Sequence, residues 1–275
     1  MNVTRHFPAE PIAQYVQSIE FIQGNTIGTG LPKSAMSLIF NLQDGFRLYD
    51  STDFETYDIY DKYWLAGFQL TPRHTQSYGQ SKMMIIQFKT LGAYAFFNES
   101  LLHFKNGFIT LDLIHKELAE VTWSKLKETN TVDQKFSIIE QYLHILLKNR
   151  KSLNSMTINR LYAALSLDNS VSVKDMCTHL NVSRKHLNTL FNQYIGVSPK
   201  AYLKLKRFRK TLHTLAKKDY HSLSSLTYEM DYFDQSHFIK DFQQLSGLTP
   251  QAYIKLLWSC PSMSTVPHYI PTLRR

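Results

Sequence analysis

The chain has 275 residues, a formal net charge of +9 at pH 7 and an aromatic content of 13%. This length suits two ordinary domains, and so many aromatic residues argue against wholesale disorder. No apolar run approaches the roughly 18 residues that suggest a membrane span, and the N-terminus lacks the apolar core of a secretion signal. The only cysteines, Cys177 and Cys260, form neither a disulfide framework nor a metal-binding spacing. We therefore expect a cytoplasmic protein with no membrane partner.

The positive charge is confined to one half of the sequence. Residues 1–154 contain 15 Lys/Arg and 15 Asp/Glu, whereas residues 155–275 contain 16 and 7. A neutral half joined to a basic half is typical of a sensing or docking domain attached to a domain that binds a polyanion. An inert basic surface would explain the charge equally well, so the assignment depends on the motifs.

Short runs of aromatic and aliphatic residues, separated by Gly and Asp turns, occupy residues 17–90. Such runs predict β-strands, and a small β-barrel or sandwich is their natural packing. The predicted strands are Met36–Leu42, Phe46–Tyr49, Tyr63–Phe68 and Met83–Phe88.

Helical patterns follow the strands. Leu111–Lys127 has an apolar stripe at helical spacing, which predicts an α-helix. Thr131 and Gln134 are spaced as a capping box ahead of a second helix. The stripe of that helix consists of Phe136, Ile139, Leu143, Leu146 and Leu147. We favour a helix that covers the β domain over a dimer face for this stripe.

The organisation predicted from these patterns is α+β. A β-barrel or sandwich-like domain with covering helices spans residues 1–150, and an all-α domain spans residues 155–257. The polar segment Lys148–Ser155 is the linker candidate. Residues 258–275 contain three prolines and no periodicity, so we expect a loose tail.

A 15-residue pattern occurs twice in the basic half, 51 residues apart. Phe191–Leu205 and Phe242–Leu256 are identical at eight positions, including a Gly, a Pro and a Tyr. Upstream, Ser183 and Asp234 occupy equivalent positions, and both residue types suit a helix N-cap. A duplicated helical unit suggests a partner that also repeats.

Each copy has a short apolar-striped helix, a tight turn and a second helix with a polar face, which is a helix-turn-helix pattern. Polar side chains of the second helix can reach bases or phosphates in a DNA major groove. The candidates in the first copy are Arg184, Lys185, Asn188, Thr189 and Asn192. Those in the second copy are Gln235, Ser236, His237, Ile239 and Lys240.

Ile239 is unusual because it is apolar among polar neighbours. It suits a contact with a thymine methyl group, and a contact with the N-terminal domain is the alternative. Between the copies, a predicted helix from Pro199 to Lys218 carries six basic residues in its first twelve positions. We favour phosphate contacts for some of them, Arg207 in particular, over a merely solvated face.

The segment Tyr228–Phe242, followed by Gly247-Leu-Thr-Pro250-Gln-Ala-Tyr253, resembles the signature of AraC/XylS-type transcriptional regulators. Asp175, Leu187 and Gly196 belong to the matching pattern in the first copy. The resemblance covers about residues 155–256. It implies two helix-turn-helix units on a shared helix, sequence-specific promoter binding and, usually, activation of transcription. Residues 8–147 more loosely resemble the β-rich domain of some of these regulators.

The chain departs from the family pattern in both turns. Asn181 and Asp231 stand where the family usually has Gly, although Asn and Asp tolerate a positive φ better than most residues. Cys177 and Thr227 replace the usual Ala at tight helix contacts and are small enough to fit.

The rival function is an enzyme with an appended DNA-binding domain. The histidines before residue 150 do not form the clustered pattern of a metal-dependent cupin, and no nucleophile or phosphate-loop motif is present. We therefore expect no catalytic residue, no metal site and no cofactor. Double-stranded DNA is the expected partner, with RNA polymerase, a small-molecule effector and a second copy of the chain as further candidates. The ligand site stays unassigned, and a constitutive regulator whose N-terminal domain only dimerises or docks a partner is the main alternative.

Overall fold

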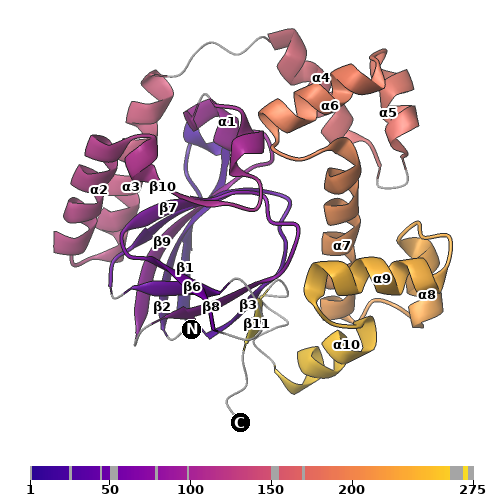
Figure 1. The fold of residues 1–275 in the computed structure, drawn as a ribbon. Helices are drawn as coiled ribbons and strands as arrows, with labels where there is room; N and C mark the ends of the chain where they lie inside the picture. Colours follow the sequence, from indigo (N-terminus) through magenta and orange to yellow (C-terminus); the bar gives the residue numbers. More distant parts are fainter. Residues whose placement is uncertain are drawn as a thin grey trace.

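A β-rich domain and a helical domain lie side by side in the computed structural model (Figure 1). The structure describes residues 2–24, 27–43, 45–49, 55–77, 80–97, 99–149, 155–168, 171–260 and 269–271. The observed architecture is the predicted α+β arrangement, with an antiparallel β domain followed by helices that include the two helix-turn-helix units. Within the described residues, no helix combines the length and the apolar character needed to cross a membrane.

The larger sheet has six antiparallel strands in the order β1-β2-β9-β4-β7-β10. Their bounds are β1 Asn2–His6, β2 Val16–Gly24, β9 Ser81–Phe88, β4 Ser37–Asn41, β7 Tyr63–Ala66 and β10 Phe108–Thr110. All four strands predicted from the sequence are present, three of them in this sheet as β4, β7 and β9, and Phe46–Tyr49 in the second sheet. Strands β1, β2 and β10, which carry more polar residues, were not individually predicted.

The second sheet has the order β11-β3-β8-β5-β6. Its strands are β3 Ile27–Gly30, β8 Arg73–Ser77, β5 Phe46–Tyr49, β6 Tyr57–Tyr60 and β11 Tyr269–Pro271. Between the two sheets, Ile39, Trp64 and Met83 are buried against Phe46, Tyr60 and Phe108. This aromatic cluster fills part of the space that joins the two sheets.

Strand β11 corrects the expectation of a loose tail at 258–275. It pairs with β3, with Tyr269 opposite Gly30 and Ile270 opposite Thr29. Ile270 is buried, so an apolar side chain and backbone pairing fix a segment that lacks any periodic pattern. Ser259 ends the preceding helix, and residues 261–268 and 272–275 lie outside the described residues.

Two helices cover the outer face of the six-stranded sheet (Figure 1). They are α2, Lys116–Glu128, and α3, Val132–Lys148. In α3 the predicted stripe is buried except for the partly buried Leu147, and the Tyr142 ring packs edge-on against Phe40 of the sheet, with 5.4 Å between centroids. The stripe therefore covers the β domain. Thr131 caps α3 by accepting a hydrogen bond from the Gln134 backbone.

The predicted helix Leu111–Lys127 is divided in the structure. Leu111–Leu113 form a short 3-10 turn, η3, and α2 begins only at Lys116. Leu111 is buried while Leu113 is exposed, so η3 forms the bend that connects β10 to α2. Helix α1, Gly92–Phe97, and the 3-10 helix η2, Leu101–Phe104, close the top of the domain.

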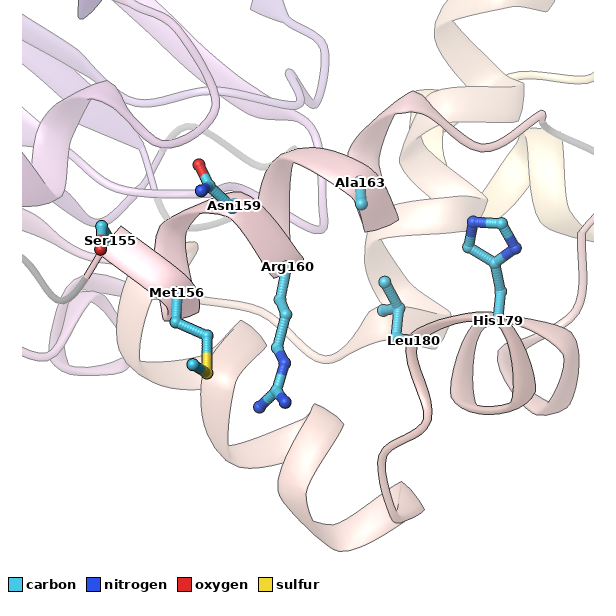
Figure 2. A pocket seen from close by; sticks show the side chains of 7 residues that line it. All are labelled: Ser155, Met156, Asn159, Arg160, Ala163, His179 and Leu180. Atoms are coloured by element: carbon cyan, nitrogen blue, oxygen red, sulfur yellow. The ribbon is translucent and has the colours of Figure 1, made fainter.

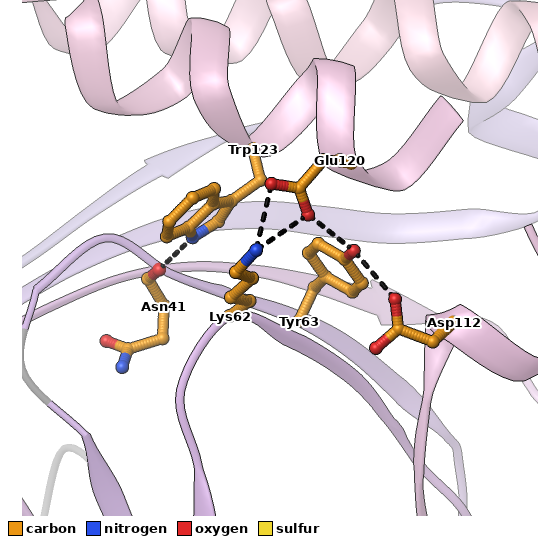
Figure 3. Close-up of polar contacts among 6 residues, drawn as sticks. All are labelled: Asn41, Lys62, Tyr63, Asp112, Glu120 and Trp123. Carbon is orange, nitrogen blue, oxygen red and sulfur yellow. Dashed lines mark hydrogen bonds and ion pairs between the residues drawn. The ribbon is translucent and has the colours of Figure 1, made fainter. Parts of the chain in front are cut away.

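A polar network ties α2 to the sheet (Figure 3). The Glu120 carboxylate accepts hydrogen bonds from Lys62 Nζ at 2.9 and 3.0 Å and from the Tyr63 hydroxyl at 2.8 Å. The indole of Trp123 donates to the Asn41 carbonyl at 2.6 Å, and Lys62 also lies over the Trp123 ring. Burial and the neighbouring carboxylates raise the pKa of Tyr63, so its hydroxyl remains a donor.

The helical domain begins after the linker candidate. Residues 150–154 of that linker lie outside the described residues, and α4 spans Ser155–Ser166. The remaining helices are α5 Val173–Leu180, α6 Arg184–Tyr194, α7 Pro199–Lys217, α8 Leu223–Glu229, α9 Gln235–Ser246 and α10 Pro250–Ser259. Pro199 and Pro250 stand in the first turns of α7 and α10, where a missing N–H costs nothing.

Replacement of Glu120 by Gln should make the fold less sensitive to acid. Hydrogen bonds from Lys62 and Tyr63 hold the pKa of Glu120 below its usual range. A carboxyl with a lowered pKa in the folded state contributes stability above its unfolded pKa and loses it as the pH falls through the folded value. Since Lys62 and Glu120 are nearly half exposed, the contribution to the free energy of unfolding should stay below about 1 kcal/mol.

Thermal unfolding of the full chain between about pH 7 and pH 3 measures this effect. Wild type should lose more stability on acidification than Glu120→Gln, while Glu117→Gln, an exposed change in the first turn of α2, should behave as wild type. Identical pH profiles for wild type and Glu120→Gln would show that the network adds no stability.

Candidate nucleic-acid interface

The first helix-turn-helix unit consists of α5 and α6. Ser172 caps α5 in a complete capping box with Asp175, and Ser183 caps α6 by accepting from the His186 backbone. Asn181 ends α5 with φ 49° and ψ 52°, the left-handed conformation that Asn tolerates better than most residues. The departure from Gly at this turn is therefore accommodated.

The second unit, α8 and α9, repeats this geometry. Ser222 forms a capping box with Ser225, and Asp234 caps α9 through the His237 backbone. Asp231 has φ 57°, so it takes the place of Asn181. Thr227 is buried and its hydroxyl bonds to the Leu223 carbonyl at 2.7 Å, which satisfies the polar group that replaces Ala.

Helix α7 joins the two units. Its 19 residues span about 28 Å at the helical rise, close to the roughly 34 Å of one DNA turn. Tyr202 packs against Phe191 of α6, and Phe208 against Phe242 of α9, with ring centroids 5.9 and 5.3 Å apart. Aromatic contacts near the N-terminal end and the middle of α7 therefore hold the two recognition helices, α6 and α9, on one support.

The candidates on α6 form a polar face opposite its buried Leu187, Leu190 and Phe191. Arg184, Lys185 and Thr189 are exposed, while Asn188 and Asn192 are partly buried. The Thr189 hydroxyl donates a hydrogen bond to the Lys185 carbonyl at 3.1 Å, so its proton is already used within the helix.

The candidates on α9 are less uniform. Gln235, Ser236, His237 and Lys240 are exposed. His237 lies beside Tyr232 and 3.8 Å from an Asp241 oxygen. Ile239 is not fully exposed as the sequence suggested, because it is partly buried and packs against the hydrophobic core.

Most basic residues of α7 make contacts within the protein. Lys204 pairs with Asp241 at 2.7 Å, and Lys206 donates to the Leu165 and Leu167 carbonyls at the end of α4. Lys200 and Lys210 are exposed. The exposed lysines of α7 are therefore its best candidates for phosphate contacts.

Arg207 of α7 packs against the second unit. Its guanidinium stands over the Tyr232 ring, 4.9 Å from the centroid, and its Nε is buried without a hydrogen-bond partner among the described residues. Stacking on the turn between α8 and α9 favours a structural role. A phosphate contact by Arg207 remains a prediction.

Both recognition helices turn their C-terminal ends toward the N-terminal domain and their N-terminal ends away from it (Figure 1). At the end of α6, Tyr194 packs against Tyr94 of α1 with ring centroids 4.4 Å apart, and Gln193 donates to the Tyr94 hydroxyl at 3.5 Å. Gly196 has φ 98°, and a Cβ there would lie 2.7 Å from the Leu101 carbonyl oxygen. Only glycine permits this approach.

A basic pair lies at the same boundary. Arg209 of α7 donates to the Ser34 hydroxyl at 2.7 Å across the two domains. Burial lowers the pKa of Lys33; Glu20 opposes this shift and the nearby Arg209 adds to it. Burial also lowers the pKa of Arg209. Because Lys33 and Arg209 are two partly buried cations close together, the contact between Arg209 and Ser34 is sensitive to a change in the charge of either residue.

A separate open cleft of about 550 Å³ lies between α4 and α5 (Figure 2). Its lining consists of Ser155, Met156, Asn159, Arg160, Ala163, His179 and Leu180. All of these residues belong to the helical domain, and none lies in the interior of the β domain.

Sequence reasoning missed one exposed apolar residue beside the interface, Phe233. Nothing in the apolar pattern marks Phe233 as exposed, yet 91% of its surface is accessible.

Two family profiles match separate parts of the chain. One, described as a helix-turn-helix domain, covers residues 176–255. The other, described as Domain of unknown function (DUF6597), covers residues 4–110. They fall on the helical and the β-rich domain respectively.

The relatives include regulators from several bacteria. The chain is 31% identical over 144 residues to the uncharacterized HTH-type transcriptional regulator YidL of Escherichia coli, covering 50% of this chain and 48% of YidL. It is 29% identical over 105 residues to the raffinose operon transcriptional regulatory protein RafR of Pediococcus pentosaceus, covering 38% of each. The chain thus spans about half or less of the curated relatives it matches.

Among solved structures, ToxT from Vibrio cholerae aligns with 86% of this chain and 98% of its own, at 13% identity and a TM-score of 0.47. The helix-turn-helix profile and the named regulators agree with the duplicated unit found in the structure. On these grounds the chain resembles AraC/XylS-type transcriptional regulators, most directly over its helix-turn-helix domain at residues 176–255.

Proposed function

We propose that the chain binds a bipartite DNA site in a sequence-specific manner, with α6 and α9 in successive major grooves. The observation that carries this proposal is the attachment of two capped helix-turn-helix units to the single helix α7. Both recognition helices present their N-terminal ends away from the β domain (Figure 1). Helix-turn-helix proteins contact bases mainly through that end.

The distribution of residues supports the same arrangement. Exposed polar side chains, Lys185 on α6 and Gln235 on α9 among them, lie near these free ends. The excess positive charge belongs entirely to residues 155–275, which suits a phosphate backbone. Base contacts by α6 and α9 would supply the specificity that charge alone cannot.

Selection from random duplex DNA with the full chain tests this function. We expect enrichment of two short motifs about one helical turn apart, with binding that weakens as salt increases. Salt-sensitive binding without any enriched motif would contradict a sequence-specific function.

Variants of α6 should then identify the half-site that it reads. Lys185→Ala and Asn188→Ala should each relax base preference at one or two positions of one motif, at a cost of roughly 1–3 kcal/mol. Fluorescence anisotropy on single-base variants of the selected site measures this change. Lys217→Ala, an exposed lysine at the far end of α7, is the matched control and should leave both motifs unchanged. If both α6 variants kept the base preference of wild type, Lys185 and Asn188 would not belong to the recognition face.

We further infer that the N-terminal domain controls DNA binding through its contacts with the helical domain. Tyr94 packs on the end of α6, Arg209 bonds to Ser34, and β11 adds a strand to the five-stranded sheet. The first unit, the shared helix α7 and the segment after α10 are therefore all connected to the β domain. A ligand or partner that changes these contacts would change the relative freedom of α6 and α9.

Two variants that loosen this docking should shift the affinity for the selected site in the same direction. One is Tyr94→Ala and the other ends the chain after Cys260, which removes β11. The change in affinity for Tyr94→Ala should not exceed about tenfold, because this variant loses a single aromatic contact. Anisotropy titrations measure it, with Tyr57→Ala as the control, since Tyr57 is an exposed aromatic residue of β6. Unchanged affinity in both variants would favour a constitutive regulator whose N-terminal domain only dimerises or docks a partner.

Promoter activation, with RNA polymerase as partner, completes the proposal. It is supported by the resemblance of Tyr228–Phe242 to the family signature. A reporter placed downstream of the selected site distinguishes activation from repression. A small-molecule effector and a homodimer remain candidate modes of control through the β domain.

A further inference from the structure

The two turns differ by one residue. Asn181 and Asp231 are both left-handed, and the next residues, Val182 and Tyr232, donate equivalent backbone bonds to Cys177 and Thr227 at 3.0 and 3.1 Å. In the first unit the N-cap, Ser183, follows immediately. In the second unit Phe233 stands between Tyr232 and the N-cap, Asp234. Phe233 therefore has no counterpart in the first unit.

This extra residue does not belong to the core. Tyr232 and Phe238 on either side are 5% and 1% exposed, whereas Phe233 is 91% exposed. Exposure of a whole phenyl ring to water is unfavourable. Folding of the unit gives no reason for it, because Tyr232 already fills the buried place that corresponds to Val182.

The position of Phe233 connects it with DNA. It directly precedes the capped first turn of α9, beside the exposed Gln235 and Ser236. The N-terminal end of a recognition helix is the part that reaches base edges in the major groove. The thymine methyl group is the apolar feature of that groove, and phenylalanine is among the side chains that contact it.

We propose that Phe233 is a specificity-determining residue that contacts a thymine methyl group in the half-site bound by α9. The proposal rests on the DNA-binding function above and adds an apolar readout that α6 lacks. It assigns to Phe233 the contact that the sequence suggested for Ile239, which packs against the core instead.

Deoxyuridine substitution tests the contact, because it removes the thymine methyl and leaves the base pair intact. Each thymine of the selected site is replaced singly, and the dissociation constants of full-length wild type and Phe233→Ala are measured. Wild type should lose about fourfold at one thymine of the α9 half-site, the equivalent of one buried methyl. Phe233→Ala should show no further loss at that thymine, and thymines of the α6 half-site should affect both proteins equally.

The controls separate this role from others. Phe233→Leu should retain part of the methyl dependence, and Trp258→Ala, an exposed aromatic change on α10, should retain all of it. Melting temperatures of the Phe233 variants should match wild type, since the ring is exposed. Equal deoxyuridine responses in wild type and Phe233→Ala, or no response in wild type, would overturn the assignment and indicate a protein-contact surface. Failure of wild type to select any motif would instead contradict the proposed function itself.

Discussion

The packing of α7 between the two helix-turn-helix units is the constraint on which the rest of the helical domain depends. Its buried face, which includes Tyr202, Leu205, Phe208 and Leu212, contacts α6 near the N-terminal end of the helix and α9 near its middle. A rigid helix fixes the spacing and relative orientation of two recognition helices without a second chain. Loss of this packing would leave each unit small and independent, with too little core to stay folded alone.

The same helix also connects the helical domain to the β domain. Arg209 reaches Ser34 across the boundary, while Lys206 binds the end of α4 within the helical domain. Positive charge on α7 thus has two uses, since part of it holds the protein together and part is left at the surface. A basic helix in a DNA-binding domain need not be a phosphate-binding helix along its whole length.

The two units are alike in fold but not in surface. Both have serine capping boxes and left-handed turn residues. The first presents a mostly polar and basic face, whereas the second adds Phe233 and an α9 face that includes His237 and the partly buried Ile239. Duplication preserved the residues that fold the unit, and the exposed positions diverged because packing does not constrain them.

The sequence by itself determined the α+β class, the four central strands and both helix-turn-helix units, because these depend on local periodicity, caps and turn residues. Only the tertiary structure decided which residues are used in contacts within the protein and which remain exposed for a partner. It placed Ile239 against the core, Arg207 on Tyr232 and Tyr269–Pro271 beside β3. Such contacts join residues far apart in the chain or depend on the exposure of one side chain. No pattern of neighbouring residues encodes them, since they follow from how the finished elements pack.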